Sequence, residues 1–399
     1  MNELRAEWQY ESQAILRWWT THMVDMENGG FYGYRDAKGN LNAEADKSII
    51  LNSRILWAFS EAALYFGDDG YREVTERAFH YLLANFIDQE YGGVFWMLTY
   101  RGEVLEDKKQ VYAQAFTIYA LSTYYLLTKD TSSLELALGL FELIETHSMD
   151  SENGGYLEAF SREWRLLEDL RLSEKDQNET KTMNTHLHVL EAYSTLWKAL
   201  KESNLDTIEK DHVKEALTKL IRLFQKKFIN EKGHLNLFFD EYWDSKSRVI
   251  SFGHDIEAAW LLWEAAEYLE DHELLFDLKP DVLRLIHATE ARGLAEDGSV
   301  WNEVHENGSL DANRHWWPQA EAMVGFYLGY QLTGEGKYLD KVKNLWKFIQ
   351  QNQIDQEGGE WHWMLDENLK PVLSEYKAGP WKAPYHNVRA LIELLRRSA

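Results

Sequence analysis

Hydrophobic residues recur at helical spacing along the chain in two alternating kinds of segment. One kind keeps a charged face, as at 71–86 and 337–350. The other kind is apolar nearly all round, and its segments are 49–65, 111–127, 183–200, 251–264, 315–330 and 385–395. Helices with a charged face lie on the outside of an assembly, and uniformly apolar helices lie inside it. The pattern therefore predicts six pairs of an outer and an inner helix.

A glycine-containing turn followed by aromatic residues separates these pairs. It is found at 27–34 (ENGGFYGY), 90–98, 152–160, 231–239, 296–304 and 357–365. Successive turns are 61 to 65 residues apart, except for one step of 78 residues that contains a polar insertion at 168–181. Glycine permits the tight turn, and the aromatic residues after it indicate a short hairpin strand.

Six such pairs fit one all-α domain over residues 1–399, an (α/α)6 barrel with six inner helices, six outer helices and short β-hairpins at the mouth of the active site. An open solenoid is the competing architecture. Closure fits better, because an open array would not need all six inner helices to be so apolar. No Pro- or Ser-rich linker divides the chain.

Each inner helix carries a conspicuous polar or aromatic residue near its start. The set is Arg54, Tyr112, Asn184 and His188, His254 and Glu257, Trp316 and Trp317 with Glu321 beyond them, and His386. One histidine at a helix start is more often a core or capping residue than a catalyst. In a closed barrel, however, equivalent positions on six inner helices meet around one axis, so we expect the set to line a single active-site cup.

Two histidines in such a cup would suit proton transfer. His254 and His386 come from different helices and could face one molecule from opposite sides, each taking and returning a proton near neutral pH. Arg54 and the helix N-termini would stabilise a developing oxyanion. For a sugar this chemistry means ring opening, then inversion of C2 or conversion to the ketose. Inverting glycoside hydrolysis is the rival, with Glu257, Glu303, Glu321 and Asp176 as candidate carboxylates.

The composition of the chain argues against several other classes of function. A formal charge of −24 argues against nucleic acid as a partner, and the chain has no cysteine for a disulfide or thiolate site. Charges interrupt the N-terminal segment and no apolar run could span a membrane, so we expect a cytoplasmic monomer.

The sequence shows no clear metal-binding motif, since His186 and His188 are two residues apart and no HExxH motif occurs. His254 with Glu257 could ligate a metal, but a carboxylate that orients a histidine is commoner, so we expect no metal or other cofactor.

Six longer stretches carry a resemblance that spans essentially the whole chain. They are LNSRILW, YAQAFTIYAL, LSEKDQNETKTMNTHLHVLEAY, SFGHDIEA, WWPQAEAMVGF and KAGPWKAPYHNVRA. In these stretches the sequence resembles the N-acylglucosamine 2-epimerase superfamily, and within it the cellobiose 2-epimerase family. The resemblance implies an (α/α)6 barrel that reversibly epimerises C2 of the reducing-end glucose of β-1,4-linked disaccharides, without metal or nucleotide.

The resemblance also implies roles for individual residues. His254 and His386 would be the acid/base pair, with Glu257 orienting His254. His188 and Asn184 would assist ring opening and hold the sugar, and Arg54 would stabilise a cis-enediolate. The implied sugar contacts are Tyr112 at the reducing end, Trp317 (or Trp316 in its place) and Trp381 by stacking, and Asp176 and Glu303 at the distal sugar.

The resemblance leaves substrate length open. Related enzymes in the superfamily act on free mannose or glucose with the same catalytic residues, so a monosaccharide epimerase is the alternative. Asp176 lies in the polar insertion and favours a disaccharide, with lactose and mannobiose as further candidates. A sugar-binding module without turnover is a third interpretation.

Overall fold

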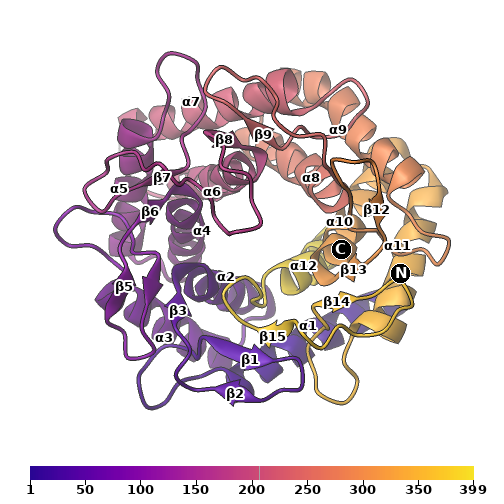
Figure 1. The fold of residues 1–399 in the computed structure, drawn as a ribbon, viewed down its shortest axis with the longest axis horizontal. Coiled ribbons are helices and arrows are strands. Elements are labelled where there is room, and N and C mark those ends of the chain that lie inside the picture. Colours follow the sequence, from indigo (N-terminus) through magenta and orange to yellow (C-terminus); the bar gives the residue numbers. More distant parts are fainter. Residues whose placement is uncertain (206) are drawn as a thin grey trace.

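The computed structural model describes residues 1–205 and 207–399, and in this part of the chain twelve α-helices form two concentric rings (Figure 1). The outer ring consists of α1 (Asn2–His22), α3 (Asp69–Asn85), α5 (Thr131–His147), α7 (Thr207–Leu223), α9 (His272–Arg292) and α11 (Gly336–Phe348). The inner ring consists of α2 (Ile49–Phe66), α4 (Val111–Thr128), α6 (Met183–Lys201), α8 (Phe252–Leu269), α10 (Trp316–Thr333) and α12 (His386–Arg397). One π-helical turn follows α7, η1 (Phe224–Phe228), and another follows α11, η2 (Ile349–Gln353). The fold is the predicted (α/α)6 barrel.

The inner helices form where the sequence is apolar on every side. Each residue of α4 from Val111 to Leu127 is buried, because outer helices cover one side and neighbouring inner helices the other. Local signals set the ends of α2: the Ser48 hydroxyl accepts a hydrogen bond from the Leu51 amide, and Gly67 closes the helix with a φ of 68°. The inner helices begin within one residue of the predicted positions, and α8 continues five residues beyond its predicted end.

Short strands gather at one end of the barrel. They are β1 (Tyr34–Asp36), β2 (Leu41–Asn42), β3 (Lys47–Ser48), β4 (Met97–Leu98), β5 (Val104–Glu106), β6 (Lys109–Gln110), β7 (Ala159–Phe160), β8 (Lys181–Thr182), β9 (Phe238–Phe239), β10 (Ile250–Ser251), β11 (Glu303–Val304), β12 (Leu310–Asp311), β13 (Arg314–His315), β14 (Met364–Leu365) and β15 (Tyr376–Ala378).

Each strand that precedes an inner helix pairs antiparallel with a strand that follows the next outer helix, as β3 does with β4 and β6 with β7. β15, before the last inner helix, pairs with β1, after the first outer helix. The strand pairs therefore link every repeat to the next and join the last repeat to the first, which closes the ring.

A buried ion pair recurs beside these strands. A lysine two residues before the inner helix binds the aspartate of the preceding glycine turn, at Lys47–Asp25 (2.8 Å), Lys109–Asp88 (2.9 Å) and Lys181–Asp150 (2.7 Å). Lys377 with Asp355 and Arg314 with Asp297 are the counterparts near the C-terminal end of the chain. Four of these aspartates lie two residues before a glycine turn and Asp297 lies within one, so the pairs fasten the turns to the chain that leads into an inner helix.

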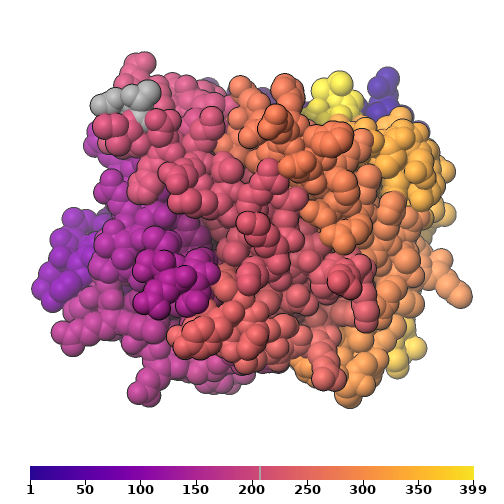
Figure 2. Space-filling model, turned by 90° about the horizontal axis from the view of Figure 1, so that it is seen from above, coloured from indigo at the N-terminus to yellow at the C-terminus, as the bar shows by residue number. Residues whose placement is uncertain are grey.

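Seen from the side, consecutive parts of the chain form neighbouring upright bands, from purple to orange (Figure 2). Each repeat thus packs mainly against the repeats before and after it, as in other repeat proteins. Among the described residues, no helix is long and apolar enough to cross a membrane.

Candidate active site

An open cavity of about 1180 Å³, including its mouth, lies at the starts of the inner helices. Eleven of the thirteen predicted site residues line it: Arg54, Tyr112, Asp176, Asn184, His188, His254, Glu257, Trp316, Trp317, Trp381 and His386. Further lining residues are Leu172, Ser173, Glu174, Lys175, Trp363, Glu375 and Tyr376. Residues that are hundreds of positions apart in the chain are thus brought into one chamber.

Trp317 packs against both histidines of the predicted acid/base pair. Its ring centroid is 4.7 Å from that of His254 and 5.7 Å from that of His386. Gly253 makes this packing feasible, since a Cβ atom there would come within 2.4 Å of the Trp317 ring. Both imidazoles therefore adjoin the same indole at the wall of one cavity.

Glu257 was expected to orient His254, and the geometry differs from that expectation. His254 Nδ1 is hydrogen-bonded to the Ser251 hydroxyl at 2.8 Å. Glu257 accepts a hydrogen bond from Arg389 instead, and no His254–Glu257 hydrogen bond is present among the described residues. The reason is that His254 occupies the first turn of α8, where its ring turns back to Ser251 just before the helix.

Glu321 was expected to line the active-site cup with the rest of the set, but it lies beneath the cavity wall. Its Oε1 accepts hydrogen bonds from His386 Nδ1 (2.6 Å) and Arg389 Nη2 (2.7 Å), and its Oε2 accepts one from Trp260 Nε1 (2.9 Å). The side chain is fully buried. Glu321 therefore orients His386, and an Nδ1–H donated to it leaves His386 Nε2 as a proton acceptor.

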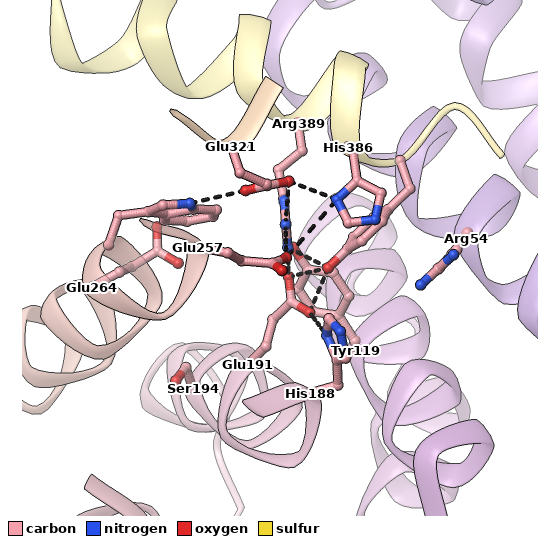
Figure 3. Close-up of polar contacts among 12 residues, drawn as sticks. Arg54, Tyr119, His188, Glu191, Ser194, Glu257, Glu264, Glu321, His386 and Arg389 are labelled. Atoms are coloured by element: carbon pink, nitrogen blue, oxygen red, sulfur yellow. Dashed lines mark hydrogen bonds and ion pairs between the residues drawn. The ribbon is translucent and has the colours of Figure 1, made fainter. Parts of the chain in front are cut away.

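His188 has a matching carboxylate, and the two histidine–carboxylate pairs meet at Arg389 (Figure 3). Glu191 lies 3.0 Å from His188 Nδ1, and both of its oxygens accept hydrogen bonds from the Tyr385 hydroxyl, at 2.7 and 2.6 Å. Arg389 donates to Glu191 through Nη1, and to Glu257 and Glu321 through Nη2. A buried network thus underlies the histidines.

Burial sets the protonation of this region. It lowers the pKa of His254 to about 3 and places the pKa of His386 well below the usual value, with Arg389 and Arg54 adding to the effect at His386. Both imidazoles are therefore neutral at pH 7 and able to accept a proton. Burial and the neighbouring Glu321 raise the pKa of Glu257 to about 7. Burial alone would raise the pKa of Glu191, but Arg389 and His188 hold it at about 2.

Arg54 and Asn184 supply further polar groups to the chamber. Arg54 donates to the Tyr112 hydroxyl (2.8 Å) and to the Trp381 carbonyl (2.9 Å), and it lies over the Phe116 ring. The buried Asn184 Oδ1 has no hydrogen-bond partner among the described residues. A buried acceptor that lines a cavity is normally satisfied by what binds there, so Asn184 is suited to a hydroxyl-rich ligand.

An aromatic wall leads outward from His386. The Trp316 and Trp363 rings are 4.4 Å apart, and the Trp363 and Tyr376 rings are 4.5 Å apart. Asp176 lines the cavity, but one of its oxygens accepts from the Ser173 amide and hydroxyl of its own loop. Glu303 is not among the lining residues and pairs with His305 at 3.1 Å on β11. A distal-sugar contact by Glu303 would therefore need a movement of its hairpin or side chain.

One group of described side chains has donor atoms close enough for a metal ion, namely Glu257, Glu321 and His386. Arg389 already binds both carboxylates, and His386 binds Glu321. A cation at this point would lie against the guanidinium charge, so the donor set is poorly suited to a metal.

Sequence reasoning missed Glu191 and Arg389, although a signal was present. Each cavity histidine is followed three positions later by a charged residue on the same helix face: His188 by Glu191, His254 by Glu257 and His386 by Arg389. A single such spacing, as at His254 and Glu257, does not distinguish a shared network from a local pair. Three repetitions of the spacing on buried helices would have indicated a shared charge network.

Comparisons with known proteins agree with this architecture. The model of the family described as N-acylglucosamine 2-epimerase (GlcNAc 2-epimerase) matches residues 30–390. The chain is 45% identical over 395 residues to a cellobiose 2-epimerase of Bacteroides fragilis, covering 98% of each chain. It is 25% identical to a D-mannose isomerase of Marinomonas mediterranea, covering 94% of this chain and 92% of the relative. The solved structure of a cellobiose 2-epimerase from Bacillus thermoamylovorans superimposes with a TM-score of 0.93 at 37% identity, covering 100% of both chains.

Proposed function

Since the chain belongs to the N-acylglucosamine 2-epimerase family and is a carbohydrate epimerase, we propose that it reversibly inverts C2 of the reducing-end glucose of cellobiose and related β-1,4-linked disaccharides. The observation that carries the proposal is the placement of His254 and His386 against one indole, in a cavity that also holds Arg54 and the unpartnered Asn184. The expected monomer and the single catalytic domain over residues 1–399 are part of this proposal.

The reaction would begin with ring opening. His188, held by Glu191, moves a proton between the O1 hydroxyl and the ring oxygen, and Asn184 Oδ1 accepts a hydrogen bond from a sugar hydroxyl. The open form has an aldehyde at C1, which acidifies the proton on C2. Arg54 contributes positive charge next to the oxygen that becomes negative.

Inversion follows by proton transfer on two faces of C2. His386 Nε2 removes the C2 proton, giving a cis-enediolate, and the imidazolium that forms lies against the Glu321 carboxylate. His254 takes up a proton from water and gives it to the opposite face of C2. The His386 imidazolium releases its proton to water, and reclosure of the ring gives the mannose configuration. Uptake from water is feasible because the His254 side chain, although mostly enclosed, is not completely buried. The reverse reaction exchanges the roles of the two histidines.

The carboxylates support epimerisation over hydrolysis. An inverting hydrolase needs two carboxyl groups roughly 6.5–9.5 Å apart across the scissile bond. Glu321 is fully buried, and Glu257 is bound to Arg389. Glu257 and Glu321 are thus engaged with Arg389, and Glu303 is not among the described residues that line the cavity. Asp176 therefore lacks a free second carboxylate from the candidate set.

Cellobiose in heavy water tests the proposal. We expect glucosylmannose with deuterium at C2, measured by NMR and mass spectrometry, and no inhibition by an added chelator. Release of free glucose would favour hydrolysis, and tight binding without turnover would favour a binding module.

The similarity to a D-mannose isomerase favours one alternative, action on free mannose or glucose. A product survey with glucose, mannose, cellobiose, mannobiose and lactose separates the two. A kcat/KM higher for a monosaccharide than for every disaccharide would reassign the substrate.

A further inference from the structure

The geometry points to Arg389 as a positioning residue that aligns His188 and His386 together, through the two carboxylates that bind them. This inference rests on the proposed function, in which His188 serves ring opening and His386 serves proton transfer at C2. Through Arg389, the position of the histidine that serves ring opening would depend on the position of the histidine that serves proton transfer at C2.

The contacts form a continuous path from one histidine to the other. His188 Nδ1 is 3.0 Å from Glu191, and Glu191 accepts from Arg389 Nη1. Arg389 Nη2 donates to Glu321 at 2.7 Å, and Glu321 lies 2.6 Å from His386 Nδ1. The same Nη2 also binds Glu257. The two terminal nitrogens of a single guanidinium thus hold three carboxylates from three inner helices, α6, α8 and α10.

Arg389 acts through these carboxylates because it does not reach the sugar. It is 2% exposed and absent from the described residues that line the substrate cavity. It lies below that cavity and lines a polar hollow at the other end of the barrel, beside Trp260 and Glu393. Its replacement should therefore alter turnover more than substrate binding.

The network depends on the shape of arginine as well as on its charge. A guanidinium is planar and presents donors in a fixed fork, whereas a lysine ammonium is a point charge on a flexible chain. Tyr385 holds the fork in place, with its ring 4.1 Å from the guanidinium carbon, and Trp260 lies at 4.8 Å. A lysine at this position keeps a positive charge but cannot hold Glu191 and Glu321 in their present directions.

The test compares Arg389→Lys with Arg396→Lys. Arg396 is a matched control because it lies two turns further along α12 and also pairs with carboxylates, Glu61 and Glu393. Within residues 1–205 and 207–399 it forms no hydrogen bond or ion pair with a histidine. For Arg389→Lys we expect kcat for the wild-type enzyme's preferred sugar to fall roughly 10- to 100-fold, as for other residues that orient reacting groups, with KM within about threefold. Arg396→Lys should leave kcat and KM unchanged.

Thermal unfolding of both variants separates alignment from simple stability. Equal losses of melting temperature with equal kcat values would make Arg389 a structural residue and overturn the inference. A raised KM with an unchanged kcat would overturn it as well. Failure of the wild-type enzyme to incorporate deuterium at C2 of any sugar would instead refute the proposed function.

A second experiment leaves Arg389 in place, in case Arg389→Lys does not fold. Glu191→Gln and Glu321→Gln are measured singly and together. If Arg389 links the two histidines, the combined loss of kcat should be at least tenfold smaller than the product of the single losses, because either change already disturbs the shared arginine. A combined loss that equals that product, or falls less than tenfold below it, would overturn the inference.

Discussion

His186 and His188 lie two residues apart on α6 and do different work. His186 Nε2 accepts a hydrogen bond from the Tyr156 amide at 2.8 Å, and its Nδ1 lies 2.6 Å from the Thr182 carbonyl. His188 is bound to Glu191 and lines the cavity. The first histidine holds the backbone of the glycine turn, and the second faces the chamber. The role of each of these histidines is thus indicated by the group that it binds.

The same division holds around the ring. The fourth residue of several inner helices binds the backbone after a glycine turn, as Gln114 does at Val94 and Gln319 does at Val300. The buried lysine–aspartate pairs repeat in the same way, and where the aspartate is replaced by Asn230, the lysine is replaced by Ile250. Residues that make the same contact in each repeat stabilise the barrel. Residues whose contacts differ from one repeat to the next form the active site.

The largest effect should come from the residues that differ between repeats. His254→Ala and His386→Ala should each lower epimerisation by roughly 10²–10⁴-fold or more, because each removes a group that transfers a proton. His186→Gln is the control, since glutamine does the same work at the equivalent position of α4 and α10. Rates of C2 deuterium exchange and circular dichroism measure the outcome. If His254→Ala kept most of its activity, His254 would not be an acid/base.

A repeated ion pair should affect folding and leave catalysis unchanged. Lys47→Met leaves Asp25 buried without its cation, and breaking such a buried pair costs roughly 3–5 kcal/mol. Urea unfolding should show this loss, while kcat of the folded fraction stays at the wild-type value. Lys129→Met, which removes an exposed pair with Glu202, is the control and should change stability by less than about 1 kcal/mol. A fall in kcat for Lys47→Met would contradict the division into two sets.

Gly253 is required both for the packing of α8 and for the geometry of the active site. A methyl group there would clash with the Trp317 ring, which packs against both imidazoles, and would displace it. We expect Gly253→Ala to lower kcat/KM by about 10- to 100-fold, as a misplacement of about 1 Å can do. Gly139→Ala, on α5 with no atom within 4 Å of the added Cβ, is the control and should be as active as wild type. Equal kinetics for the two variants would show that Trp317 can move without consequence.

The smallest effect concerns acid stability. Ion pairing and backbone hydrogen bonds outweigh burial and lower the pKa of Asp25, and they bring that of Asp150 to about 2. A lowered native pKa contributes stability above the unfolded value of about 3.9 that is lost as the pH falls from about 4 towards the native pKa. Wild type should therefore lose stability more steeply than Lys47→Met between pH 5 and 3, measured by urea midpoints. Parallel pH curves would mean that Lys47 does not set the pKa of Asp25.

The sequence was sufficient for the barrel and for most of the cavity lining. Apolar segments and glycine turns recur with one period, so the sequence alone shows which positions of the six inner helices are equivalent. Arg54, His188 and Glu257 each stand sixth in their helices, which placed them at one level.

The partners of the histidines were harder to predict. Glu321 reaches His386 from another helix, and Arg389 joins three helices, so these contacts depend on how the closed barrel rotates each helix about its axis. The spacing of His254 and Glu257 gave a shared face but could not show that Ser251 and Arg389 would take their hydrogen bonds. The spacing of residues in the sequence shows which side chains share a helix face, but the packing of the closed barrel determines which side chains of other helices they contact.

Closure itself links turnover to the most distant contacts in the chain. β15 pairs with β1, and Arg5 Nη1 donates to the Leu395 carbonyl across 390 positions of sequence. His386 and Arg389 belong to α12, the helix that meets α1 at this seam. During refolding, the return of enzymatic rate should therefore lag behind the return of helical signal, since native turnover needs both extremities of the polypeptide to have met.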